Sequence, residues 1–264
     1  MIMKHSKIVK VPIISFTINQ LLKYGVHLGN STIKWNPQLS AYLYCFRLNI
    51  CIFNLKHTIL LFRRALLVLS AIIKQKGYVL FVASNVQNKH LIPLLTNFLK
   101  VWPHPYIKHG WLGGTITSWN KNYLAIKKYD LNKKSKKSLK LLFHGLSKMK
   151  YLPDAAILLN VQEDTYNLSS KNISLNDLGT TDFSSKNYFA KNVAIKNELM
   201  KVKIPTVGFI NSAASLNGIT YPIPVNTYYP SAIMLYLNIL LYTFKDVISR
   251  QKLKKKKKLN LLLK

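Results

Sequence analysis

Three short apolar runs constrain the fold more than any other feature of the sequence. They are residues 78–83 (YVLFVA), 155–160 (AAILLN) and 205–210 (PTVGFI). A continuous apolar run of this length is typical of a strand buried on both faces of a parallel sheet. Stretches with helical period lie between the runs, which indicates βαβ units. We therefore predict an α/β fold, a three-layer sandwich built on a mostly parallel sheet.

Caps and hydrophobic period predict the other elements of this Rossmann-like or flavodoxin-like domain. A capping box of Thr17 and Gln20 begins a helix that ends before Gly25. Strands over 42–46 and 50–53 form a hairpin that turns at Leu48 and Asn49. Further helices are expected over residues 54–75 (with Gly77 as the terminating glycine), 85–100, 192–201 and 230–249.

We expect one domain over residues 17–250, preceded by an extension over 1–16. Residues 120–150 carry ten Lys and one acid, and are predicted to form a projecting helical excursion. Residues 162–190, rich in Ser, Asn and Thr, are predicted to be a polar insertion. Residues 251–264 contain five consecutive lysines and are predicted to be a basic tail that does not pack.

The charge balance limits the partners of the chain. It has 39 Lys+Arg against 8 Asp+Glu, a net charge of +31, although only 18% of residues are charged. The imbalance therefore comes from missing acids. Such a chain repels itself unless a polyanion neutralises it, which favours nucleic acid or an anionic membrane as the partner. The 49% hydrophobic content supports a real core, so the chain is more than a disordered basic tail.

Catalytic and metal-binding patterns are absent from the sequence. The seven histidines show neither HExxH nor zinc-finger spacing, and no GxGxxG or GxxxxGK[ST] loop occurs. Asp154, which follows Pro153 before a predicted strand, is interpreted as a turn or capping residue, although a paired-carboxylate site would have to recruit it, Glu163, Asp164 or Glu198. We expect no catalytic site, metal or cofactor.

Two motifs combine glycine, aromatic, amide and hydroxyl residues, over 24–37 (YGVHLGNSTIKWNP) and 110–120 (GWLGGTITSWN). Glycines allow close backbone approach, Thr and Asn form uncharged hydrogen bonds, and Trp can stack on bases. The alternatives are core packing, which is favoured for the tryptophans, and a simple turn at Gly113 and Gly114, for which a surface role is favoured instead. The RNA-binding candidates in these motifs are Lys34, Trp35, Asn36, Trp111, Gly113, Gly114, Thr115 and Thr117.

Lysines supply a second set of candidates, whose role would be attraction of phosphates without sequence preference. They lie in the expected excursion and in the tail: Lys121, Lys133, Lys134, Lys136, Lys137, Lys254, Lys255 and Lys256. No membrane span is expected, because the apolar runs are shorter than about 20 residues. Cys45 and Cys51 are expected to be free thiols, as is usual in a reducing compartment.

The motifs resemble the family of ribosomal protein two of the small subunit. LLKYGVHLGNSTIKWNPQLSAYLY followed by ICIFNLKHT is similar to that family's N-terminal signature, and GWLGGTITSW to its RWLGGxLTN motif. Residues 151–160 (YLPDAAILLN), 203–207 (KIPTV) and 217–226 (NGITYPIPVN) resemble its LPD, GIPVI and D-G-x-D-Y-x-I-P-x-N segments. The resemblance covers residues 17–244 apart from the two insert regions.

This resemblance implies a non-catalytic α/β domain between the head and body of the small subunit, bound to its rRNA and to other small-subunit proteins. In bacteria the family helps to dock the large mRNA-binding protein one. The chain departs from the family pattern where acids are expected, with Asn54, Asn160, Ser215, Asn217 and Thr220, and has Asn30 where His is usual. The excursion is also shorter than the family's helical hairpin.

We predict a structural constituent of an organellar small ribosomal subunit that does not form homo-oligomers. The 35 lysines against four arginines, with abundant Asn and Ile, indicate an AT-rich genome. Mitochondrial translation is therefore favoured over plastid translation. Two alternatives are an α/β enzyme acting on phosphorylated substrates, with residues 110–117 as its phosphate loop, and a peripheral membrane protein held by its lysines.

Overall fold

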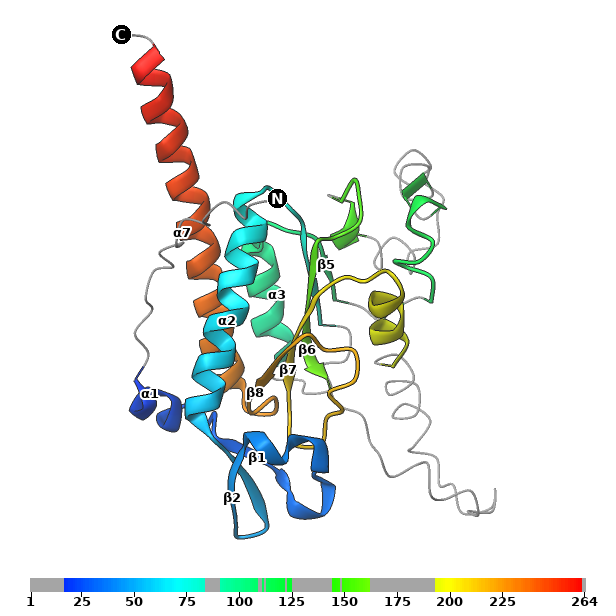
Figure 1. Ribbon diagram of the computed structural model, residues 1–264, viewed down its shortest axis with the longest axis vertical. Helices are drawn as coiled ribbons and strands as arrows, with labels where there is room; N and C mark the ends of the chain where they lie inside the picture. Colours follow the sequence, from blue (N-terminus) through cyan, green and yellow to red (C-terminus); the bar gives the residue numbers. More distant parts are fainter. Residues whose placement is uncertain are drawn as a thin grey trace, which may run out of the picture.

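The computed structural model describes residues 17–83, 91–108, 111, 113–121, 123–124, 144–147, 149–161 and 193–262 (Figure 1). The predicted N-terminal extension, the polar insertion and most of the lysine-rich excursion lie outside these residues. The cap predicted at Asn85 lies outside them as well.

The central sheet has five strands and confirms the predicted fold class. In chain order they are β4 (Val79–Val82), β5 (Tyr106–Ile107), β6 (Ala155–Val161), β7 (Thr206–Ile210) and β8 (Tyr221–Pro224). All neighbouring strands are parallel, and their spatial order is β5-β4-β6-β7-β8. Numbered from the first strand of this sheet, the order is 2-1-3-4-5, which is the flavodoxin-like arrangement. The three apolar runs form β4, β6 and β7.

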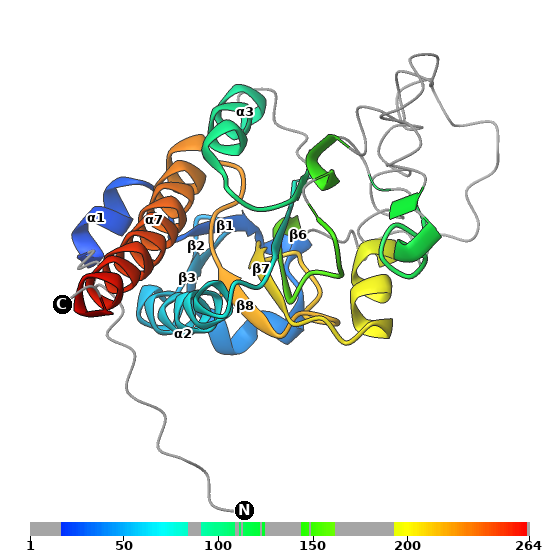
Figure 2. The same cartoon turned by 90° about the horizontal axis from the view of Figure 1, so that it is seen from above.

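Helices cover both faces of this sheet and make three layers (Figure 2). On one face, α2 (Leu55–Lys74), α3 (Leu91–Val101) and α7 (Pro230–Leu262) pack against alternate strand residues such as Val79 and Phe81. On the other face, Leu80 and Val82 pack against the helix over residues 193–201 and the tryptophan-rich segment near residue 116. The strands are thus buried on both sides, as their continuous apolar sequence predicts.

Aromatic side chains fill the larger of the two cores. The rings of Phe62 and Tyr236 meet edge to face with centroids 4.9 Å apart, and those of Trp102 and Phe244 lie 4.7 Å apart. His104 packs against Trp102 and Phe244. Burial lowers the pKa of His104 to about 4, so this histidine is neutral at physiological pH and adds nothing to the cationic surface.

The N-terminal region forms a second, smaller sheet. The capping box of Thr17 and Gln20 begins α1 (Ile18–Lys23), as predicted. β2 (Leu43–Arg47) and β3 (Ile50–Phe53) form the predicted hairpin, whose turn residues Leu48 and Asn49 both have positive φ. Sequence alone did not predict β1 (Leu28–Ser31), which pairs with β3 to give the antiparallel order β1-β3-β2, nor the short helices η1 (Thr32–Lys34) and η2 (Pro37–Tyr42).

Gly77 follows the end of α2, but its role differs from the expected one. The left-handed residue is Lys76, with φ +63°, while the Gly77 amide donates to the Ile72 carbonyl at 3.0 Å and closes the last turn. Gly77 must lack a side chain because a Cβ there would lie 2.6 Å from the Asp154 carboxylate. That carboxylate accepts a hydrogen bond from the Tyr78 amide at 2.9 Å. Asp154 is therefore structural, as predicted.

Helix α7 is longer than the sequence predicted. The expected end was Ser249, but the helix continues to Leu262 and includes the lysine run. Lysine has good helix propensity, and no glycine or proline interrupts the segment. The helix can therefore continue through the lysine-rich tail. Figure 1 shows α7 extending beyond the other elements to the C-terminus.

One helical segment of the described chain, Pro230–Leu253 of α7, is long and apolar enough to cross a membrane, and half of it is buried in the protein. Its buried residues include Tyr236, Leu240 and Phe244, which belong to the larger core. This packing is that of a core helix. Both Cys45 and Cys51 are free, as expected.

Candidate nucleic-acid interface

The glycine-rich loop of the second motif is built around a buried carboxylate. Glu198, on the helix over 193–201, is only 8% exposed. Its Oε1 accepts hydrogen bonds from the Trp111 indole Nε1 at 3.0 Å and from the Gly114 amide at 2.7 Å. Its Oε2 accepts from the amides of Ile116 at 3.1 Å and Thr117 at 3.5 Å. Glu198 therefore fixes the conformation of this loop from the inside.

This arrangement determines what the loop can bind. Gly114 has φ +84°, which only glycine adopts without strain, and the turn there directs the amides of Gly114, Ile116 and Thr117 towards one carboxylate. Converging amides of this kind are an anion site. Here the anion is the chain's own carboxylate, so these amides are not available to a substrate phosphate. The structure thereby removes the observation on which the enzyme alternative depended.

The predicted contact residues of this motif divide into buried and exposed groups. The side chains of Trp111 and Thr115 are 7% and 3% exposed and lie inside the protein. Gly113, Thr117 and Lys121 are exposed, and Gly114 is half-buried. Only the exposed group can touch RNA without rearrangement. Trp111 packs in the smaller core, which contains Leu80 and Val82. This agrees with the interpretation of the tryptophans as core residues.

The first motif divides in the same way. Lys34 is exposed, and Trp35 is half-buried with its ring 5.2 Å from that of Phe46, edge to face. Asn36 is 8% exposed. Its side-chain Nδ2 donates to the Ala214 carbonyl at 3.1 Å, and its side-chain Oδ1 accepts from the Gln38 backbone amide. Asn36 therefore joins the small sheet to the large one, and its polar atoms are engaged within the protein.

A polar network at the carboxyl end of β7 was not predicted. The Asn30 amide donates to Ser212 Oγ at 2.7 Å, and the Asn211 side chain donates to Asn30 Oδ1 at 2.7 Å. A Cβ on Gly29 would lie 3.0 Å from both the Cys51 carbonyl and Ser212 Oγ. Open α/β sheets usually bind ligands at this edge. In this chain the small sheet packs against the end of β7, and a side chain on Gly29 would make contacts there that are tighter than usual.

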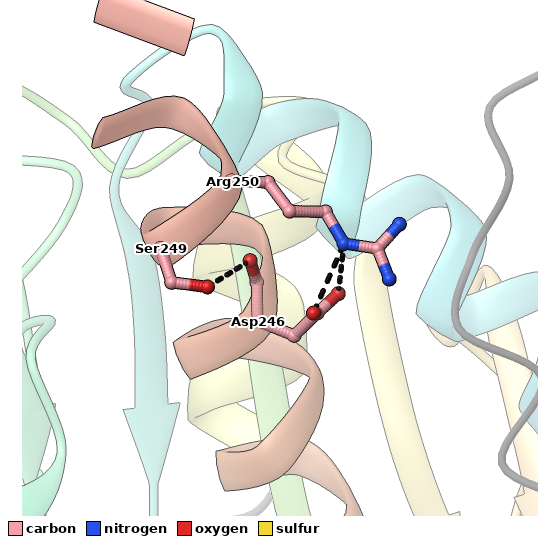
Figure 3. A network of polar contacts seen from close by, with 3 residues as sticks. All are labelled: Asp246, Ser249 and Arg250. Carbon is pink, nitrogen blue, oxygen red and sulfur yellow. Dashed lines mark hydrogen bonds and ion pairs between the residues drawn. The ribbon is translucent and has the colours of Figure 1, made fainter. Parts of the chain in front are cut away.

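The acids within the described residues do not offset the cationic surface. Asp154 and Glu198 accept the backbone hydrogen bonds given above. Asp246 forms an ion pair with Arg250, 2.8 Å from Oδ2 to Nε, and its carbonyl accepts from Ser249 Oγ (Figure 3). Each of these carboxylates is thus engaged by groups of the chain itself, Asp154 and Glu198 by backbone amides and Asp246 by Arg250 at the surface of α7.

The remaining lysine candidates are placed less fully. Lys133, Lys134, Lys136 and Lys137 lie outside the described residues. Lys254, Lys255 and Lys256 belong to the projecting part of α7. Among the described residues no group of His, Cys, Asp and Glu side chains is arranged to hold a metal ion.

The fold and the site together define a cationic α/β domain that uses its described carboxylates to hold its own structure. Residues 21–174 match the family model described as ribosomal protein S2, and the chain belongs to this family. Members of the family are structural, non-enzymatic components. The family expectation drawn from the two motifs is thereby confirmed.

Similar proteins come from bacteria. The small ribosomal subunit protein uS2 of Rhizorhabdus wittichii is 32% identical over 220 residues, covering 83% of each chain. The uS2 protein of Brucella anthropi is 30% identical over 255 residues, covering 89% of this chain and 88% of its own. The uS2 protein of Bartonella tribocorum is 29% identical and covers 89% of this chain and 84% of its own.

Proposed function

We propose that this protein is a structural constituent of the small ribosomal subunit that binds small-subunit rRNA and neighbouring ribosomal proteins in mitochondrial translation. Family membership supports the structural role. The observation that carries the RNA proposal is the surface charge: the net charge is +31, while the described acids are engaged internally. A polyanion is the partner that neutralises such a surface.

The specific contact is proposed for the exposed rim of the two motifs, which consists of Lys34, Gly113, Thr117 and Lys121. These residues are exposed, whereas Asn36, Trp111 and Thr115 support the rim from inside. Because Glu198 fixes the loop of the second motif, Gly113 and Thr117 are presented in a defined shape, and RNA-binding proteins recognise folded RNA largely by shape. The lysine-rich segments would add affinity without selecting a site.

Substituting Gly113 by valine tests the rim. A Cβ at Gly113 meets no atom within 4 Å, and Gly113 does not have positive φ, so the variant is expected to fold and melt normally. Bulk at a site of close RNA approach should lower incorporation into small subunits by roughly tenfold, the equivalent of about 1.4 kcal/mol. Quantitative reconstitution with purified subunit components measures this.

Gly114→Val is the matched control. Gly114 has φ +84°, so valine there is strained and should lower the melting temperature, which Gly113→Val should not do. Wild-type incorporation of a normally melting Gly113→Val protein would mean that the loop is structural and that the RNA-contacting surface lies elsewhere.

The mitochondrial setting is supported by composition. Lysine outnumbers arginine 35 to four, as expected from an AT-rich genome. The family role does not depend on this setting.

A further inference from the structure

The tip of the small sheet exposes a group of large apolar side chains, which we call the hairpin patch: Ile33, Tyr44, Phe46, Leu48 and Ile50. Leu48 is 89% exposed, Ile33 77% and Tyr44 74%. Single exposed apolar residues are common, but clustered ones mark interaction sites. Figure 1 shows this hairpin at the end of the molecule opposite the C-terminus of α7.

Hydrogen bonds and ring contacts hold these residues around the tip of one hairpin, where Phe46 and Ile50 lie on opposite faces of the two strands. Ile50 pairs with Ser31 of β1 on one side and with Arg47 of β2 on the other. The Thr32 amide donates to the Asn49 carbonyl at 2.9 Å, which brings the segment carrying Ile33 to the turn. Trp35 packs against Phe46 at the inner border of the patch.

Leu48 is the most informative member, because two unfavourable features coincide there. Its φ is +48°, in the left-handed region that suits Asn or Gly and strains leucine. Its side chain is also the most exposed of the patch. Neither the turn nor the core of this protein gains from a leucine at this position, so its apolar side chain points to a contact outside the chain.

The composition of the patch favours a protein over RNA as the occupant. Ile33, Leu48 and Ile50 are aliphatic and cannot stack on bases as aromatic rings do. Exposed Tyr and Phe side chains beside Trp35 and Arg47 match the residues enriched in protein interfaces. Lys34 and Arg47 border the patch, and none of the three described acids belongs to the hairpin or to η1.

We propose that the hairpin patch docks a neighbouring small-subunit protein that presents an apolar surface bordered by carboxylates. This inference rests on the proposed function, because that function places other ribosomal proteins beside the chain. It adds a surface distinct from the loop of Gly113 and Thr117, whereas Lys34, which borders the patch, also belongs to the residues proposed to contact rRNA.

Leu48→Asn in the full-length protein tests the proposal. Asparagine suits a positive φ, so the isolated variant should melt at the wild-type temperature or higher. Loss of a leucine anchor should nevertheless weaken incorporation into protein-containing small subunits roughly tenfold or more. Affinity for naked small-subunit rRNA should stay at the wild-type value. Leu48→Met, which keeps an apolar side chain at the same φ, is the matched control and should incorporate normally.

The outcomes separate this proposal from the proposed function. Reduced affinity of Leu48→Asn for naked rRNA would make the patch an RNA surface and overturn the docking proposal. Normal incorporation of Leu48→Asn would overturn it as well. Failure of the wild-type protein to bind either naked rRNA or subunits would instead contradict the proposed function. A photoreactive phenylalanine analogue at position 48 should cross-link to a protein in assembled subunits, and cross-linking to rRNA alone would contradict the proposal.

Discussion

Glu198→Ala is expected to lower the free energy of unfolding by about 3–5 kcal/mol, because it leaves several buried donors without an acceptor. The Trp111 indole and the amides of Gly114 and Ile116 all donate to this carboxylate. Each donor would lose its partner in a part of the chain that water reaches poorly. Urea denaturation followed by tryptophan fluorescence measures the loss, and Trp111 itself reports on the loop.

Two further variants define the cause of that loss. Glu198→Gln keeps one oxygen but turns an NH₂ group towards amides that need an acceptor, so its stability should lie between those of the wild type and the alanine variant. Asp246→Asn removes a carboxylate from a single ion pair at the surface of α7 and should cost no more than about 1 kcal/mol. A loss below about 1 kcal/mol for Glu198→Ala would mean that the loop holds its shape without the carboxylate.

Replacing the five lysines of residues 254–258 by glutamine is expected to reduce rRNA affinity strongly and to flatten its salt dependence. If each lysine neutralises one phosphate, the slope of log affinity against log salt concentration should fall by about 3.5 to 4.5 units. Glutamine has good helix propensity, so α7 should remain helical to Leu262 by circular dichroism. Filter binding of a small-subunit rRNA fragment over a range of salt concentrations measures the slope.

Arginine at the same five positions is the control, since it keeps the charge and should keep the slope. Glutamine and wild-type proteins with equal slopes would show that this part of α7 does not contact phosphate. Lysines of the predicted excursion give a second comparison with those of α7. Lys133→Gln and Lys137→Gln in the predicted excursion should also lower the slope, but by less than five substitutions do.

Much of the large sheet could be predicted from sequence because β4, β6 and β7 are central strands with continuous apolar runs. The helix caps at Thr17 and Asn54 also follow from local chemistry, and the place of the hairpin turn follows from the alternating strands on either side of it. Edge strands carry weaker signals. β5 has two residues, and β8 contains two prolines, which an edge strand tolerates because it lacks a neighbour on one side.

The candidate site was predictable in outline and not in detail. The two motifs were found because glycine and tryptophan are dense in them, but their sequence does not show which side chains point inwards. Glu198 is 84 residues from Gly114, so only the fold brings the carboxylate to the loop. The contact between Asn30 and Asn211 spans 181 residues and was missed for the same reason. In both cases polar side chains form hydrogen bonds between residues that are far apart in the sequence, and no local sequence pattern predicts such bonds.

The central claim, that this chain is a constituent of the small ribosomal subunit, is tested most directly by sedimentation of the full-length protein. Cells carrying a tagged copy are separated into mitochondrial and other fractions, each fraction is lysed at moderate salt, and each lysate is resolved on a sucrose gradient with small-subunit rRNA measured throughout. We expect the protein to comigrate with small-subunit rRNA and to leave those fractions after ribonuclease treatment. Tagged protein that stays at the top of the gradient, while intact small subunits sediment normally, would contradict the assignment, and comigration with small subunits of another compartment would contradict the mitochondrial setting alone.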